Sequence, residues 1–367
     1  MAMFTESTKR IDPGTSPIHR LAETMVSDMR RRGLSLGDRY LTAAEAGRML
    51  GVSLTTANRA MRLLADRDVL VRSRSRGTYV GPGHEVPRET NHATIHILFY
   101  DTKRRPIRLS YNELLDGVSE RVSVASLKFT RVPDEDSVHF VKNTIEADIH
   151  AGRLFGVIAG GCPRPVCRYL KDRNIPVVIL GSPYAETNQI ATVDLDMRQA
   201  GYLEAEYLIG HGHDRLALIA MEDWRPGDNL FLEGVQAAMA EARLTPKALV
   251  VRSTIPEKSA AIPEIRNLLE RNDPPTGLIC RHRGFVEAAQ EAADSLNIHI
   301  PEELQLVVDA SNKQHLTELD VPCCLPERGI WNIAKILGGM LCDITEGKEI
   351  EPRHVLISVV MHDTVPK

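Results

Sequence analysis

Short apolar runs recur along the chain from residue 95 onward, and stretches with the spacing of amphipathic helices separate them. The runs are residues 95–100, 129–132, 156–159, 177–180, 216–220, 249–251, 277–280 and 304–308. Strands that are buried on both faces and alternate with helices predict parallel sheets covered on each side. These runs are too many for one compact Rossmann-like lobe, so we expect an α/β fold with two lobes.

A different pattern precedes them. Residues 41–45 read Leu-Thr-Ala-Ala-Glu, in which Thr42 can cap a helix and Glu45 can reach back to it. We expect this helix to end at Gly51 and Ser53 to cap a second helix. The second helix should bury one stripe and turn a polar, cationic face outward. The stripe comprises Ala57, Ala60, Met61 and Leu64, and the outward face comprises Thr55, Thr56, Asn58, Arg59 and Arg62.

A basic hairpin is predicted to follow, with strands at residues 69–71 and 78–80. Arg72, Arg74 and Arg76 occupy alternate positions and would share one face of a strand. Gly77 permits a backbone turn beside a phosphate, and a helix from Pro17 to about Arg32 should support the unit. Together these elements predict a winged helix-turn-helix, whose second helix suits a DNA major groove about 12 Å wide.

The charge distribution separates the same two regions. Through residue 82 the chain has 14 Lys/Arg against 8 Asp/Glu, so a net charge of −4 for the whole leaves −10 for the remainder. A positive N-terminal end concentrates attraction for phosphate there. No apolar segment approaches the roughly 20 residues that span a bilayer, so we expect no membrane partner and a cytoplasmic location. Six scattered cysteines without CxxC spacing favour buried free thiols.

The N-terminal motifs resemble the DNA-binding domain of GntR-family transcription regulators. The resemblance covers about the first 80 residues and rests on residues 41–45, 50–53, 55–56, 59–60 and 76–80. Family members usually carry arginine where this chain has Leu54 and Asn58, which bears on the operator sequence. The residues that we expect at the DNA are Thr42, Glu45, Ser53, Thr55, Thr56, Asn58, Arg59, Arg62, Arg72, Arg74, Arg76 and Gly77.

A second resemblance spans nearly all of residues 94–367. Residues 175–181, 193–196, 199–202, 205–208, 212–213, 216–219, 274–280, 300–302 and 325–327 are similar to the effector-binding domain of LacI-family regulators. That family's domain is periplasmic-binding-protein-like and holds a ligand between two lobes joined by three crossovers. The combination resembles the arabinose-repressor type of regulator. It implies three segments: a DNA-binding domain at 1–82, a linker at 83–93, and an effector-binding and dimerisation domain at 94–367.

Ligands of such folds bind beyond the carboxyl ends of the strands. The candidate effector-binding residues are Tyr100, Asp101, Tyr111, Asn112, Asp196, Trp224, Asp228, His282, Arg283 and Asp309. Sugar-binding LacI relatives usually have Asn-Asp in place of His282-Arg283. A cationic pair there favours an anionic carbohydrate, such as a sugar phosphate or sugar acid. Alternatively, Arg283 pairs with Glu287 on its own helix, and the cleft has no ligand.

The sequence thus predicts a homodimeric, DNA-binding transcription regulator, a repressor controlled by a small metabolite, on a pseudo-palindromic operator. An activator with the same parts, or a metabolite-binding protein whose N-terminal unit contacts protein, is the alternative. Neither an enzyme, a cofactor nor a metal site is expected, because no catalytic group can be assembled. His211-Gly-His213 is better explained as a helix end than as a metal pair.

Overall fold

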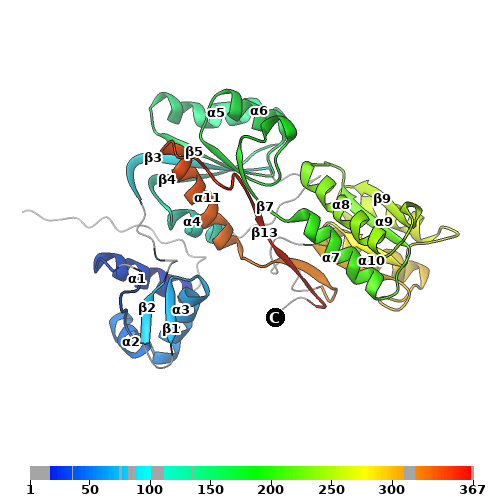
Figure 1. The fold of residues 1–367 in the computed structure, drawn as a ribbon, viewed down its shortest axis with the longest axis horizontal. Coiled ribbons are helices and arrows are strands. Elements are labelled where there is room, and N and C mark those ends of the chain that lie inside the picture. Colours follow the sequence, from blue (N-terminus) through cyan, green and yellow to red (C-terminus); the bar gives the residue numbers. More distant parts are fainter. Residues whose placement is uncertain are drawn as a thin grey trace, which may run out of the picture. The chain divides into compact units, whose positions relative to one another are not determined.

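The computed structural model describes residues 17–34, 36–73, 77–81, 84, 88–100, 111–133, 135–309 and 319–364. The chain forms two compact units, Met1–Arg88 and Glu89–Lys367 (Figure 1). The unit boundary falls within the predicted linker of residues 83–93, but strand β3 (Arg88–Phe99) occupies the end of that segment. Residues 88–93 of the predicted linker therefore belong to β3. Pairing of β3 with β5 begins only at Thr94. The residues of β3 before Thr94 lack the apolar period that marks a buried strand, so the sequence did not indicate a strand there.

The described residues of unit 1 form three helices and an antiparallel hairpin in the predicted order. They are α1 (Pro17–Arg31), α2 (Ala43–Leu50), α3 (Leu54–Asp66), β1 (Leu70–Ser73) and β2 (Gly77–Val80). Gly51 ends α2 in the left-handed conformation, at φ 66°, which a residue without Cβ adopts without strain. The predicted stripe on α3 is fully buried, and Met25 and Met29 of α1 are buried with it. Local capping and apolar spacing therefore account for this unit.

Unit 2 has two lobes, each built on a six-stranded sheet. The sheet of lobe 1 has the order β13-β7-β6-β5-β3-β4. Its further elements are α4 (Tyr111–Ser119), β4 (Val122–Arg131), α5 (Ser137–His150), β5 (Leu154–Gly160), α6 (Arg164–Asp172), β6 (Val177–Leu180), η1 (Ala185–Thr187), β7 (Ala191–Leu195), α11 (Ile330–Thr345) and β13 (His354–Ile357). Helices α4 and α11 lie on one face of the sheet, and α5 and α6 lie on the other (Figure 1). Their side chains pack with those of the strands in two separate core clusters.

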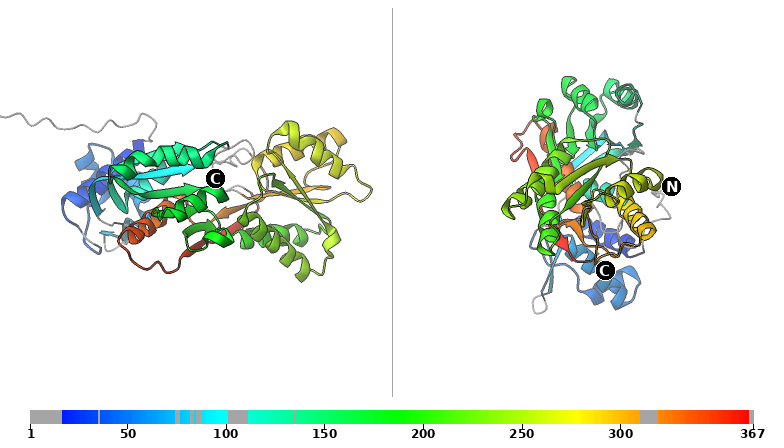
Figure 2. Two further views of the ribbon diagram at one scale, coloured as in Figure 1. Left: turned by 90° about the horizontal axis from the view of Figure 1, so that it is seen from above. Right: turned by 90° about the vertical axis from the view of Figure 1, so that its right-hand side faces the viewer.

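The sheet of lobe 2 has the order β14-β12-β11-β10-β8-β9. Its elements are α7 (Met197–Gly210), β8 (Leu216–Met221), α8 (Pro226–Glu241), η2 (Pro246–Ala248), β9 (Leu249–Thr254), α9 (Lys258–Leu269), β10 (Gly277–Cys280), α10 (Arg283–Leu296), β11 (Gln305–Asp309), β12 (Cys323–Pro326) and β14 (Val359–His362). Helices α7 and α8 cover one face, and α9 and α10 the other, as Figure 2 also shows.

The predicted parallel sheets are confirmed. Neighbours from β8 to β12 pair in parallel, as do β3, β5, β6, β7 and β13, while β14 joins β12 antiparallel. The chain passes between the lobes three times: after β7, after β12, and between β13 and β14. Strands β7, β12, β13 and β14 were not among the predicted runs. β13 and β14 are edge strands that expose Leu356 and Val360, so they are not apolar on both faces.

All six cysteines are free and buried, as predicted. The described residues bring no three His, Cys, Asp or Glu side chains into an arrangement that could hold a metal ion. Within the same part of the chain, no helix combines the length and apolar character that a membrane crossing requires.

Candidate functional site

The outward face of α3 is polar and cationic. Thr55, Arg59 and Arg62 are exposed, and Thr56 and Asn58 are partly buried. Ala57 and Ala60 lie between these positions in the sequence and are fully buried. The helix therefore packs its small residues against the core and exposes its cationic side chains to solvent. Such a face can approach a polyanion without displacing core residues.

Three of the predicted DNA-binding side chains also form the helix caps. The backbone N–H of Thr42 donates to Glu45 Oε2 at 2.7 Å, and the backbone N–H of Glu45 donates to Thr42 Oγ1 at 3.3 Å. The Glu45 carboxylate also accepts from the Thr42 hydroxyl at 2.8 Å, and the hydrogen bonds that it accepts from the Thr42 backbone N–H and then from this hydroxyl lower the pKa of Glu45. Ser53 Oγ accepts from the backbone N–H of Thr56 at 3.1 Å. The three side chains therefore fix where α2 and α3 begin, whatever else they contact.

A side-chain hydrogen bond ties the hairpin to α3. Arg72 on β1 donates to Asn58 Oδ1 at 2.7 Å. Gly77 opens β2 at φ 105°, a conformation that favours glycine. Arg74 and Arg76, the other two predicted hairpin arginines, lie outside the described residues. The described part of the hairpin thus presents its first arginine toward the helix that carries Arg59.

Lobe 2 contains a buried arginine that the sequence analysis missed. Arg281, directly after β10, donates to Asp309 Oδ2 at 2.6 Å and to Asp228 Oδ1 at 3.2 Å. Its guanidinium lies 4.0 Å from the centre of the Phe231 ring. Burial alone would lower the pKa of Arg281, but Asp309 and Asp228 raise it above its ordinary value. Two predicted effector-binding carboxylates, Asp228 and Asp309, are therefore already paired with a cation.

Two further carboxyl groups lie near this arginine. Glu204 on α7 is completely buried, and neither of its carboxyl oxygens has a hydrogen-bond partner. Burial, and then the charge of Asp309, raise the pKa of Glu204 well above its ordinary value. Asp194 on β7 accepts from Ser182 Oγ at 2.5 Å, and burial raises its pKa to about 6. The region where the lobes join thus holds more carboxyl groups than cations.

The side chains of His282 and Arg283 both bond to groups of α10, the helix that they begin. His282 is the N-cap of α10 and accepts at Nδ1 from the backbone N–H of Gly284, at 3.0 Å. Arg283 binds Glu287 through Nε at 2.9 Å, and through its terminal nitrogen at 2.7 Å. This is the alternative pairing considered for Arg283 in the sequence. Asp196 likewise caps α7, accepting from the backbone N–H of Gln199 at 2.9 Å.

The remaining predicted effector-binding residues differ in burial and in their hydrogen-bond partners. Tyr100 follows β3 and is buried, and burial raises its pKa. The Trp224 indole N–H donates to Asn229 Oδ1 at 2.7 Å. Asn112 is exposed near the start of α4, whereas the side chain of Tyr111 and the whole of Asp101 lie outside the described residues.

Arg225 connects the two lobes. From the start of α8 in lobe 2, it donates to the carbonyl oxygen of Gly161 in lobe 1, while its Nε holds Asp223 at 2.8 Å. A Cβ added at Gly227 would lie 3.1 Å from Ser182 Oγ, so the start of α8 lies against lobe 1. Both Arg225 and Arg281 follow strand ends, the positions where the fold places ligand-contacting groups.

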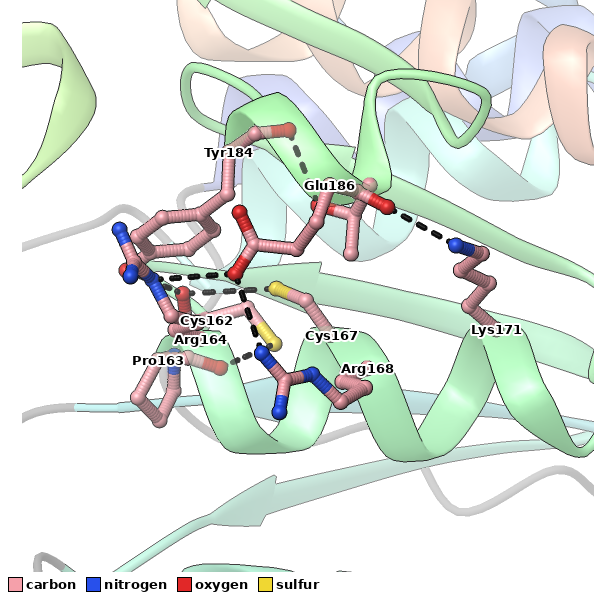
Figure 3. A network of polar contacts seen from close by, with 9 residues as sticks. Cys162, Pro163, Arg164, Cys167, Arg168, Lys171, Tyr184 and Glu186 are labelled. Carbon is pink, nitrogen blue, oxygen red and sulfur yellow. Dashed lines mark hydrogen bonds and ion pairs between the residues drawn. The ribbon is translucent and has the colours of Figure 1, made fainter.

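The loops of lobe 1 that face this contact are braced by the network in Figure 3. The Glu186 carboxylate forms ion pairs with Arg164, at 3.2 Å, and with Arg168, at 3.4 Å. Tyr184 donates to the carbonyl oxygen of Cys162 at 3.4 Å, and the Arg164 guanidinium lies 5.2 Å from the centre of its ring. These contacts therefore hold the loop after β6 against the start of α6.

Comparisons with known proteins agree with this architecture. A family profile described as a periplasmic binding protein-like domain matches residues 205–364. The repressor PurR of Proteus mirabilis is 27% identical over 135 residues, 37% of this chain and 40% of that protein. The regulator AglR of Rhizobium meliloti is 22% identical over 268 residues, 71% of this chain and 74% of that protein. The chain thus matches well under half the length of PurR.

Among solved structures, a regulatory protein of the LacI family from Chloroflexus aggregans has a TM-score of 0.62 at 18% identity, covering 75% of this chain and 98% of its own. The transcriptional regulator CelR in complex with cellobiose has a TM-score of 0.60 at 16% identity, covering 94% of this chain and 98% of its own. The fold defines unit 2 as a two-lobed periplasmic-binding-protein-like domain. It is similar to the corresponding domains of LacI-family regulators.

Proposed function

We propose that the protein is a DNA-binding transcription regulator, a repressor controlled by a small metabolite. The observation that carries the proposal is the division of α3 into a completely buried stripe of small residues and an exposed face with Arg59 and Arg62. The repressors PurR and CytR are among the relatives of this chain, which supports the same function.

We assign unit 1 to the winged helix-turn-helix class, of the GntR type. The antiparallel hairpin directly after α3 supports this assignment, as does the bond from Arg72 to Asn58. In this arrangement α3 enters the major groove, and the hairpin meets phosphate or the adjacent minor groove. Unit 2 would pair two chains into a homodimer, and two-fold symmetry would then require a pseudo-palindromic operator.

Replacing Arg59 with alanine is expected to weaken operator binding by about 1–3 kcal/mol and to relax the preference at one base pair. The reason is that an exposed guanidinium on this face can bind a base edge or a phosphate. Gel shifts at several salt concentrations, with a duplex selected from a random library, measure both effects. Arg266→Ala is the matched control, because this exposed arginine pairs with Glu270 on α9 in unit 2. The lack of any salt-dependent gel shift with the wild type would instead favour a protein-binding role for unit 1.

For the effector, we propose a carbohydrate bound between the lobes, with a sugar phosphate or sugar acid as the favoured class. The contact of Arg225 with lobe 1 supports control through lobe closure, because a ligand there would change the same contact. A difference of about 1–3 kcal/mol between the two lobe arrangements would change operator affinity 5- to 150-fold. An anionic ligand would have to exchange with Glu287 for the guanidinium of Arg283.

Calorimetry tests this class with a neutral hexose, its 6-phosphate and the corresponding aldonic acid. If Arg283 binds the anionic group, Arg283→Ala should abolish heat from the charged compounds and leave any response to the neutral sugar unchanged. Tight binding of the neutral sugar alone, unaffected by the substitution, would contradict an anionic effector.

A further inference from the structure

The first residue of α3 is an exposed leucine on an otherwise polar face. Leu54 is 55% exposed, and Asn58, one helical turn later, lies on the same face. A single exposed leucine is ordinary on a protein surface. Its position makes this one informative, because it stands at the start of the helix that carries Arg59 and Arg62, where the proposed function places the bases.

The hydroxyl groups of Ser53 and Thr56 are used within the protein. Ser53 Oγ lies 2.9 Å from Thr56 Oγ1, and it also accepts from the Thr56 backbone N–H. Ser53 and Thr56 are therefore held in the cap. Leu54 and Thr55 remain as the exposed side chains of the first turn.

Asn58 is similarly committed. Its Oδ1 accepts from Arg72, at 2.7 Å. Reading an adenine by two hydrogen bonds requires both the oxygen and the nitrogen of the amide. The bond to Arg72 uses one of the two lone pairs of Oδ1 and ties the amide oxygen to the hairpin. The bond to Arg72 therefore competes with adenine selection through Asn58, and Leu54 adds apolar contact to the chemistry of this part of the face.

We propose that Leu54 is a specificity residue that contacts the 5-methyl group of a thymine. This rests on the proposed function. In unmodified DNA the thymine methyl is the apolar group that the major groove presents, so an exposed leucine side chain there selects thymine. The contact removes about one methyl group from water, which corresponds to roughly a 4-fold gain in affinity.

The experiment replaces each thymine by deoxyuridine, which lacks only the methyl group, in a duplex selected by the full-length protein from a random library. One position in each half-site should lose binding about 4-fold with the wild type. Leu54→Ala should bind the thymine and deoxyuridine duplexes equally. Leu36→Ala is the matched control, because Leu36 is 67% exposed in the same unit but lies outside α3. It should keep the wild-type sensitivity.

Two results would overturn the inference while leaving the proposed function intact. One is salt-dependent duplex binding in which no deoxyuridine matters. The other is a Leu54→Ala variant that retains the same sensitive position. Circular dichroism of the variant confirms that unit 1 is folded in either case. Failure to select any duplex would overturn the proposed function, and this inference with it.

Discussion

Replacing Arg281 with methionine is expected to lower the free energy of unfolding by about 3–5 kcal/mol. Methionine fills a similar length, but Asp228 and Asp309 would remain buried without their cation. Urea unfolding followed by tryptophan fluorescence measures the loss. The chain has two tryptophans, Trp224 and Trp331, and both belong to unit 2, so the signal reports the unit that contains Arg281.

The matched control is Arg266→Met, which removes an exposed arginine that pairs with Glu270 one turn away on α9. Its effect should stay within about 0.5 kcal/mol, because exposed ion pairs contribute little. Adding Asp309→Asn to Arg281→Met should cost less than the sum of the two single changes, since the partners are in contact. A loss below about 1 kcal/mol for Arg281→Met would mean that the carboxylates are hydrated or protonated rather than paired.

What the sequence predicted well is local. The caps at Thr42 and Ser53 and the stripe on α3 depend on residues three or four positions apart, a spacing that can be seen in one dimension. The eight apolar runs predicted the parallel sheets for the same reason, because the apolar residues of each strand are adjacent in the sequence. The apolar pattern is weaker in the edge strands β13 and β14, since each needs apolar side chains on only one face.

The site was harder to predict because its contacts are not local. Arg281, Asp228 and Asp309 come from three elements, and Arg281 lies 53 residues from Asp228 and 28 from Asp309. No periodicity relates such positions. The neighbouring Arg283 stood out because of its place in the family motif, yet its partner is one turn away on its own helix. The buried cation was identified only when the fold showed which strand-end residue points inward.

Removing the carboxyl group of Glu204 is expected to change how stability depends on pH. The folded state raises the pKa of this group, so it retains a proton that the unfolded chain releases above about pH 4.5. Stability from this group is therefore complete below the unfolded pKa and declines as pH rises toward the folded pKa. The slope is about 1.4 kcal/mol per pH unit between the unfolded and the folded pKa.

Glu204→Gln and Glu204→Met should both remove that slope, and the methionine variant should exceed the wild type in stability at pH 7.5, since its side chain suits the surrounding core. Other groups titrate in the same range: burial raises the pKa of Asp194 to about 6, and burial lowers that of His96. The measured quantity is therefore the wild-type free energy of unfolding minus that of each variant, from which unaltered groups largely cancel.

Glu206→Gln supplies the control on the same helix, because Glu206 is exposed and the charge change is identical. This variant should keep the wild-type pH dependence. Parallel curves for the wild type and Glu204→Gln would mean that the buried carboxyl group titrates alike in the folded and unfolded chains. That result would require a hydrogen-bond donor or a compensating cation at Glu204, and Arg281 is the nearest identified candidate, because its charge already acts on this carboxyl group.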